Sequence, residues 1–108
     1  MNEIVILSTT DSMELAETIA ESVVTQGTAA CVNIAPGIRS IYRWEGKICD
    51  DAEFLLFIKT SEDRFEQVRE TICRLHSYNT PEVIALPITA GDPRYLSWLH
   101  SQIQDRLE

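Results

Sequence analysis

Hydrophobic and polar positions repeat with two different periods in the first third of the chain. An unbroken apolar run at residues 4–9 is typical of a strand at the centre of a sheet. Residues 15–24 then place apolar side chains at helical spacing, with acidic side chains on the opposite face. Asp11 is the expected N-cap of this helix and Gly27 its expected end, because glycine adopts a left-handed conformation at little cost. The pattern therefore predicts a strand followed by an amphipathic helix.

The middle of the chain predicts a long hairpin. Residues 30–34 alternate apolar and polar side chains at strand spacing, and Pro36-Gly37 then interrupts the run as a bend or bulge. Extended character resumes over residues 38–44, and Glu45-Gly46 has the composition of a tight turn. A return strand covers residues 54–59. The far end of this hairpin has few partners nearby in the chain, so we expect it to project and to pair with a neighbouring subunit.

The last third predicts two more helices with a strand between them. Ser61 is expected to cap a helix with an apolar stripe, residues 82–86 form a short strand, and Asp92-Pro93 starts the final helix. The resulting order indicates an α+β fold, a ferredoxin-like βαββαβ sandwich with a C-terminal helix, formed by residues 1–108 as a single domain. Two helices would cover one face of the sheet, and self-association is expected to supply part of the cover for the other.

Composition and charge narrow the possible functions. The 108 residues are 44% hydrophobic and carry a formal net charge of −8, which argues against nucleic acid or an anionic membrane as a partner. The start of the chain lacks the basic and apolar regions of a signal peptide, and no apolar run approaches the length that spans a bilayer. Three widely spaced cysteines without a C-x-x-C motif indicate reduced thiols. We therefore expect a cytoplasmic protein.

Several segments, in register along nearly the whole chain, resemble the CutA divalent-cation tolerance family. They are AACVNIAPG at residues 29–37, SIYRWEGK at 40–47, LLFIKT at 55–60, HSYNTPEVIALPI at 76–88 and YLSWL at 95–99. The resemblance implies a homotrimer in which the long hairpins reach neighbouring subunits. It also implies an architecture similar to PII signalling proteins, which bind small ligands in clefts between subunits. The family is named for tolerance to divalent cations, notably copper, and its members are usually described as metal-binding.

A metal site is one hypothesis for the chemistry of this chain. His76 and Glu82 are separated by a short loop, and imidazole suits copper and zinc; Cys31 would add a thiolate from a neighbouring strand. The alternatives are that His76 only caps its helix in solvent and that Cys31 is a small buried residue. Some family members carry an extra cysteine and an extra histidine where this chain has Ser8 and Leu75, so a site built on those ligands is not expected here.

A ligand cleft between subunits is the second hypothesis. Tyr78, Trp44 and Trp98 are large side chains outside the apolar stripes, and Lys59 ends a strongly apolar strand. In a cleft, Lys59 would attract a small anionic metabolite or pair with Glu82. The alternative is packing at a subunit interface, where aromatic side chains are enriched, with Lys59 in a structural salt bridge.

Catalytic motifs are absent from the sequence. It contains no G-x-S-x-G, no Walker loop, no H-E-x-x-H and no glycine-rich dinucleotide turn, so we predict a protein that is not an enzyme and needs no cofactor to fold. Three functions remain open: a trimeric divalent-cation tolerance protein that binds copper or another metal, a PII-like sensor of a small metabolite, and a trimeric scaffold that anchors a partner protein.

Overall fold

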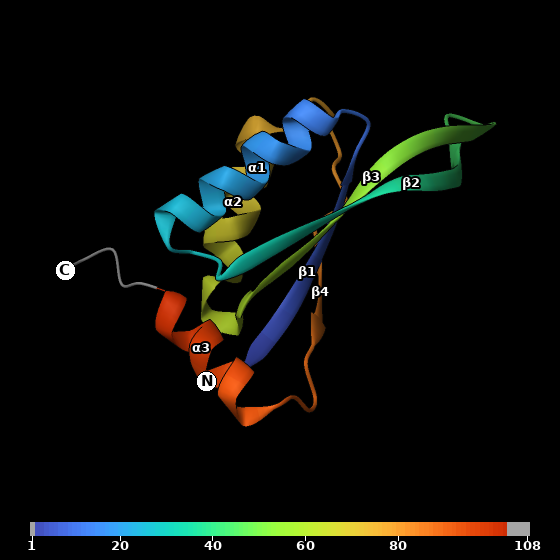
Figure 1. Cartoon of the computed structure of the whole chain (residues 1–108). Coiled ribbons are helices and arrows are strands. Elements are labelled where there is room, and N and C mark those ends of the chain that lie inside the picture. Colours follow the sequence, from blue (N-terminus) through green and yellow to red (C-terminus); the bar gives the residue numbers. More distant parts are fainter. Residues whose placement is uncertain (1, 104–108) are drawn as a thin grey trace.

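The computed structural model describes residues 2–103. Strands and helices follow one another in the predicted order (Figure 1). They are β1 (Glu3–Thr10), α1 (Met13–Gln26), β2 (Cys31–Trp44), β3 (Lys47–Ser61), the 3₁₀ helix η1 (Glu62–Arg64), α2 (Phe65–Leu75), β4 (Ile84–Pro87) and α3 (Pro93–Gln102).

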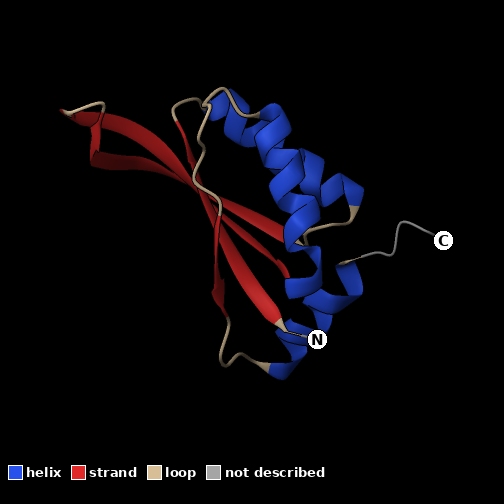
Figure 2. Cartoon of the chain, turned by 180° about the vertical axis from the view of Figure 1, so that it is seen from behind, coloured by secondary structure: helices blue, strands red, loops and turns tan. Residues whose placement is uncertain are grey.

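The four strands form one antiparallel sheet in the order β2-β3-β1-β4. Helices α1 and α2 lie together on one face of this sheet, and α3 lies below them at the end where β1 begins (Figure 1). Within residues 2–103, the opposite face carries no helix, as the view from behind shows (Figure 2). This arrangement confirms the predicted ferredoxin-like α+β fold.

The core lies between the sheet and the two long helices. Every second residue of β1 is buried, which is the strand period expected for a face that packs against helices. Its Ile6 is paired with Ile58 of β3, and both side chains are fully buried. The helices contribute Ala16, Ile19, Val23, Val68 and Ile72. The apolar stripes predicted from sequence are therefore the surfaces that hold the layers together.

The other sheet face is apolar and uncovered. In antiparallel strands, directly paired residues point to the same side. Leu7 is paired with both Phe57 and Ile84, and Val5 is paired with Leu86. Ile84 and Leu86 leave 49% and 50% of their area exposed. These five residues define what we call the open face, and an apolar area of this kind indicates an interaction surface.

The β2–β3 hairpin extends past the rest of the sheet (Figure 1). The register shifts between Ala35 and Ile38, where Pro36-Gly37 was predicted to form a bulge. The turn has positive φ at Glu45 (51°) and Gly46 (80°), which matches the twist of the strands it joins. The predicted long hairpin and its turn are therefore confirmed.

Gly27 ends α1 in a left-handed conformation as predicted, whereas two of the three predicted N-caps are wrong and one is confirmed. Ser12, not Asp11, caps α1, because its Oγ accepts a hydrogen bond from the Leu15 N–H at 3.2 Å. Neighbouring Asp and Ser side chains are both competent caps, so the sequence alone did not choose between them. Ser61 makes no cap and hydrogen-bonds Asp63 instead, while η1 precedes α2. Asp92 caps α3 as predicted, accepting from the Arg94 N–H at 2.8 Å.

Helix α3 is joined to the beginning of β1 by a polar contact and a buried apolar one. The His100 ring hydrogen-bonds the Glu3 carboxylate, and this contact lowers the pKa of Glu3 below its ordinary value. Leu99 beside it is fully buried. These contacts fix α3 against the end of the sheet.

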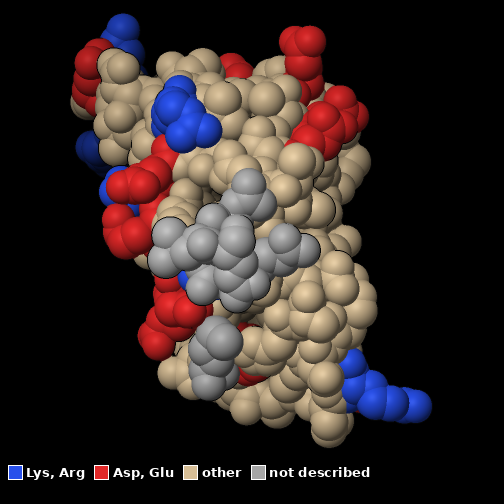
Figure 3. Space-filling view, turned by 90° about the vertical axis from the view of Figure 1, so that its left-hand side faces the viewer, with Lys and Arg blue, Asp and Glu red and all other residues tan. Residues whose placement is uncertain are grey.

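The acidic side chains on the helical side of the molecule are clustered (Figure 3). In Figure 3, acidic side chains collect along one edge and at one upper corner, and uncharged side chains fill much of the space between them.

None of the helices in residues 2–103 has the length and apolar character needed to cross a membrane.

Candidate functional site

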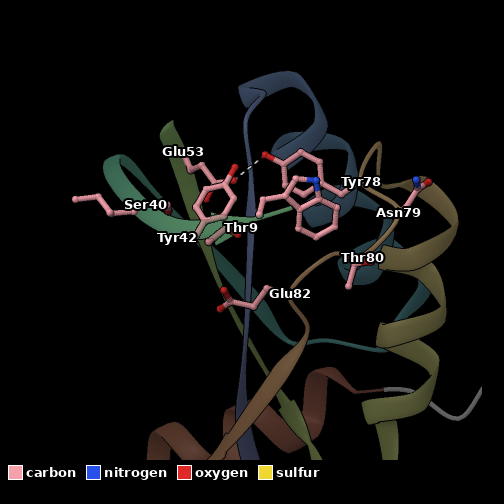
Figure 4. A pocket seen from close by; sticks show the side chains of 10 residues that line it. Thr9, Ser40, Tyr42, Glu53, Tyr78, Asn79, Thr80 and Glu82 are labelled. Carbon is pink, nitrogen blue, oxygen red and sulfur yellow. Dashed lines mark hydrogen bonds between the residues drawn. The ribbon is translucent and has the colours of Figure 1, made fainter. Parts of the chain in front are cut away.

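A hollow of about 620 Å³ opens between the β2–β3 hairpin and the segment that links α2 to β4. We call it the hairpin pocket; its lining includes Thr9, Tyr42, Trp44, Glu53, Tyr78 and Glu82. Figure 4 shows Tyr42 and Glu53 reaching it from the hairpin, and Tyr78 and Glu82 from the linking segment. A concave site with aromatic walls and a few polar groups is the usual character of a small-molecule pocket.

Glu53 is the most buried charged residue of the pocket, with 7% of its area exposed. The Tyr78 hydroxyl donates a hydrogen bond to Glu53 Oε2 at 2.7 Å (Figure 4). Burial raises the pKa of Tyr78 well above its ordinary value, and the Glu53 carboxylate raises that pKa further because it faces the phenol. Glu53 was not among the candidate residues predicted from the sequence. Its strand period could have identified it, because that period places Glu53 on the same face of β3 as Leu55 and Phe57.

His76 is held by hydrogen bonds at both ring nitrogens. Nδ1 accepts the Tyr78 N–H at 3.1 Å, and Nε2 lies 2.8 Å from the Thr9 carbonyl oxygen. Because Nδ1 accepts, we assign the ring proton to Nε2, which donates it to Thr9. The ring also contacts that of Tyr78, with centroids 4.5 Å apart. His76 therefore joins the end of α2 to the end of β1 and positions Tyr78 for Glu53.

The three predicted metal ligands do not meet in this chain. Cys31 is paired with Lys59, while Thr9 at the pocket is paired with Leu55, about 13 Å further along β3. Both nitrogens of His76 are engaged, and within residues 2–103 no three His, Cys, Asp or Glu side chains are grouped to hold a metal ion. The residues therefore do not fit a bound metal in this conformation, and copper binding at these positions stays a prediction.

The four predicted cleft residues form two separate groups within one chain. Tyr78 and Trp44 line the hairpin pocket. Lys59 and Trp98 instead surround Tyr95 of α3: the Lys59 Nζ lies 5.8 Å from the Tyr95 ring centroid, and the Trp98 ring lies 5.6 Å from it. A Lys above an aromatic face is a favourable cation–π arrangement. Lys59 is therefore occupied away from the hairpin pocket.

Tyr42 adds a second restrained phenol to the pocket. Its hydroxyl hydrogen-bonds the Asp51 carboxylate on the neighbouring strand, and this bond raises the pKa of Tyr42 to about 12. Tyr42 was not singled out from the sequence, although the turn predicted at Glu45-Gly46 sets a register that places Tyr42 and Asp51 on the same face of the hairpin.

An alkaline titration tests both tyrosine environments. The pKa values of Tyr42 and Tyr78 are raised above the ordinary 10.0, so folding favours their neutral forms. Their contribution to stability is complete below pH 10.0 and is lost as the pH rises through the raised values. We expect phenolate absorbance to show two late tyrosines in the native protein and one in Tyr78→Phe. Three tyrosines that titrate together near pH 10.0 would contradict these assignments.

The fold and the pocket together define the class of this protein: a ferredoxin-like α+β protein with a projecting hairpin and a ligand-sized hollow at the hairpin's base. The chain belongs to the CutA1 divalent ion tolerance protein family, whose model matches residues 4–102. This membership confirms the resemblance seen in the sequence.

Individual relatives agree with that membership. The chain is 48% identical over 97 residues to "Divalent-cation tolerance protein CutA" of Thermus thermophilus, covering 90% of this chain and 94% of the relative. It is 46% identical to "Protein CutA, chloroplastic" of Arabidopsis thaliana, covering 94% of this chain but 56% of that longer protein. The crystal structure of CutA1 from Oryza sativa superposes with a TM-score of 0.94 at 44% identity, covering 97% of this chain and 96% of that one.

Proposed function

We propose that this chain acts in divalent-cation tolerance as a homotrimeric protein that binds a small polar ligand in the hairpin pocket. One observation carries the proposal: a hollow of about 620 Å³ brings aromatic rings and the carboxylates of Glu53 and Glu82 to one place. That volume lies within the range of small-molecule sites and is far larger than a single ion requires. Cation tolerance would then follow from sensing or carrying a metabolite rather than from ligating the metal.

The homotrimer is supported by the open face and the hairpin. Both expose large apolar side chains: Ile84 and Leu86 on the sheet, and Ile41 and Ile48 on the hairpin, at 49%, 50%, 65% and 66% of their area. A domain of this size buries a modest fraction of its surface alone, so association would add the missing burial. Leu55 and Thr9, which are paired at the border between the open face and the pocket, would place the pocket beside a neighbouring subunit.

Direct copper binding is the second candidate function; the name printed for the Thermus thermophilus relative refers to divalent-cation tolerance and does not specify copper. It would use His76, Glu82 and Cys31, and a copper ion would first have to displace Tyr78 or Thr9 from the His76 ring. Calorimetric titration of the reduced, metal-free protein with copper separates the two candidates. Tight binding at a fixed ratio, lost in His76→Ala, would support the metal site.

A thermal-shift screen tests the pocket proposal. A ligand present at about 100 times its Kd raises the free energy of unfolding by about 2.7 kcal/mol, so metabolites that bind will raise Tm. Thr80→Phe narrows the pocket, and Thr89→Phe makes the same exposed change outside the lining residues. We expect at least one organic compound to raise Tm in the wild type and in Thr89→Phe but not in Thr80→Phe. Compounds that stabilise all three proteins equally would contradict the proposal.

A further inference from the structure

We infer that the ligand of the hairpin pocket is a short organic cation with ammonium groups at both ends, held by Glu53 and Glu82. The inference rests on the proposal that this pocket is a ligand site, and it adds the charge and the shape of the ligand. It also departs from the anionic metabolite that the sequence suggested.

The charged side chains that line the hairpin pocket favour a cationic ligand. Of the described residues that line the pocket, the charged ones are Glu53 and Glu82, and no lysine or arginine is among them. Lys59, which the sequence offered as the anion-binding group, lies against Tyr95 instead. The whole chain carries a formal charge of −8, so an anion would approach the pocket against a field of its own sign. A cation would approach with that field.

The Glu53 carboxylate can accept more hydrogen bonds than the Tyr78 hydroxyl supplies, which also favours a cationic ligand. An ionised carboxylate offers about four acceptor positions, and buried carboxylates are normally paired with cationic donors. Glu53 is 7% exposed and accepts a hydrogen bond from the neutral Tyr78 hydroxyl. Within residues 2–103, neither Glu53 nor Glu82 forms a salt bridge with a Lys, Arg or His side chain. A ligand ammonium would supply the cationic donor that the chain itself does not.

The aromatic side chains that line the pocket favour an organic cation over a metal ion. Tyr42, Trp44 and Tyr78 line the pocket, and aromatic faces attract ammonium groups through cation–π interactions. The two carboxylates come from different elements, Glu53 from β3 and Glu82 from the segment before β4 (Figure 4). A molecule with a cation at each end and an apolar chain between them matches this arrangement.

Calorimetric titration with three probes of equal chain length tests the inference. The probes are 1,4-diaminobutane, 1,4-butanediol and succinate, which carry two positive, no and two negative charges. We expect 1,4-diaminobutane to bind roughly tenfold or more tighter than 1,4-butanediol, the difference that a charge-assisted hydrogen bond supplies. Succinate is expected to give no binding heat. Titrations at physiological salt suppress attraction to the surface charge as a whole.

Three glutamine variants locate the binding. Glu53→Gln keeps an acceptor for Tyr78 while removing the charge, and we expect it to weaken diamine binding about tenfold. Glu82 is exposed, and we expect Glu82→Gln to weaken diamine binding as well. Glu17→Gln removes one charge from the exposed side of α1 and should leave binding unchanged. Thermal melts of the ligand-free variants check that each is folded.

The outcomes separate this inference from the proposed function. Equal or tighter binding of 1,4-butanediol or succinate, abolished by Thr80→Phe, would overturn the cationic ligand and leave the pocket as a ligand site. Diamine binding that is identical in all three glutamine variants would also overturn it, because general attraction to an acidic protein would then explain the heat. No heat from any probe would overturn it too, as expected if a neighbouring copy of the chain fills the pocket, and the thermal-shift screen would decide the function separately.

Discussion

Replacing Leu7 with aspartate is expected to break the assembled protein into monomers. Leu7 lies in the middle of the open face, paired with Phe57 on one side and Ile84 on the other. If this face is the centre of a homotrimer, each subunit would bury an unpaired carboxylate there, at a cost of about 3 kcal/mol or more. Light scattering or sedimentation should therefore give the wild type three times the 12.2 kDa chain mass and the variant a single chain mass.

Gln67→Asp is the matched control for this change. It adds the same charge at an exposed position on α2, on the helical side of the sheet, and should leave the mass unchanged. Far-ultraviolet circular dichroism checks that the Leu7→Asp variant keeps its fold, which we expect. A trimeric mass for Leu7→Asp, or a monomeric mass for the wild type, would contradict the assembly and any cleft between subunits.

Replacing His76 is expected to destabilise the metal-free protein. His76→Ala leaves the Thr9 carbonyl and the Tyr78 N–H without their protein partner and removes the ring that packs on Tyr78. An unmade hydrogen bond of this kind costs about 1–3 kcal/mol, toward the lower end here because His76 is partly exposed to water. Urea unfolding in the presence of a chelator measures the loss.

His76→Phe distinguishes the hydrogen bonds from the ring contact. It keeps an aromatic ring beside Tyr78 but has no nitrogen, so we expect a loss close to that of His76→Ala. Cys73→Ala, an exposed change on the same helix, should be nearly neutral. Unchanged stability of the metal-free His76→Ala protein would show that the hydrogen bonds of the His76 ring to Thr9 and Tyr78 do not stabilise the fold. The ring would then be free to bind a metal ion.

The sequence predicted the fold because its two periods are local properties. The 3.6-residue stripe of α1 matches the side chains that this helix buries, and the apolar run of β1 matches its place between β3 and β4 in the sheet. The turn residues also predicted the register of the hairpin. Glu45 and Gly46 adopt positive φ and form the turn at the position that their composition indicated. Ser12 rather than Asp11 caps α1, and because both residue types are competent N-caps the sequence did not distinguish them.

The candidate site could be predicted only in part, because it is made by contacts between distant segments. His76 was identified as a functional candidate, but its acceptor is the backbone carbonyl of Thr9, and a backbone group leaves no signature in a sequence. Glu53 was missed because an acidic residue before an apolar strand has the pattern of a solvated strand end. It is buried because Tyr78, contributed by a loop 25 residues further along the chain, closes over it.

The two tryptophans of the chain provide the most direct test of the central claim that the hairpin pocket is the ligand site. Trp44 lines the pocket, whereas Trp98 packs on Tyr95 of α3 and serves as a control in the same spectrum. The measurement is the pair of indole N–H resonances, followed by NMR during titration with a compound that raises Tm. We predict that the Trp44 signal moves with saturation while the Trp98 signal stays in place. A shift of Trp98 alone, or of neither signal, would contradict the account.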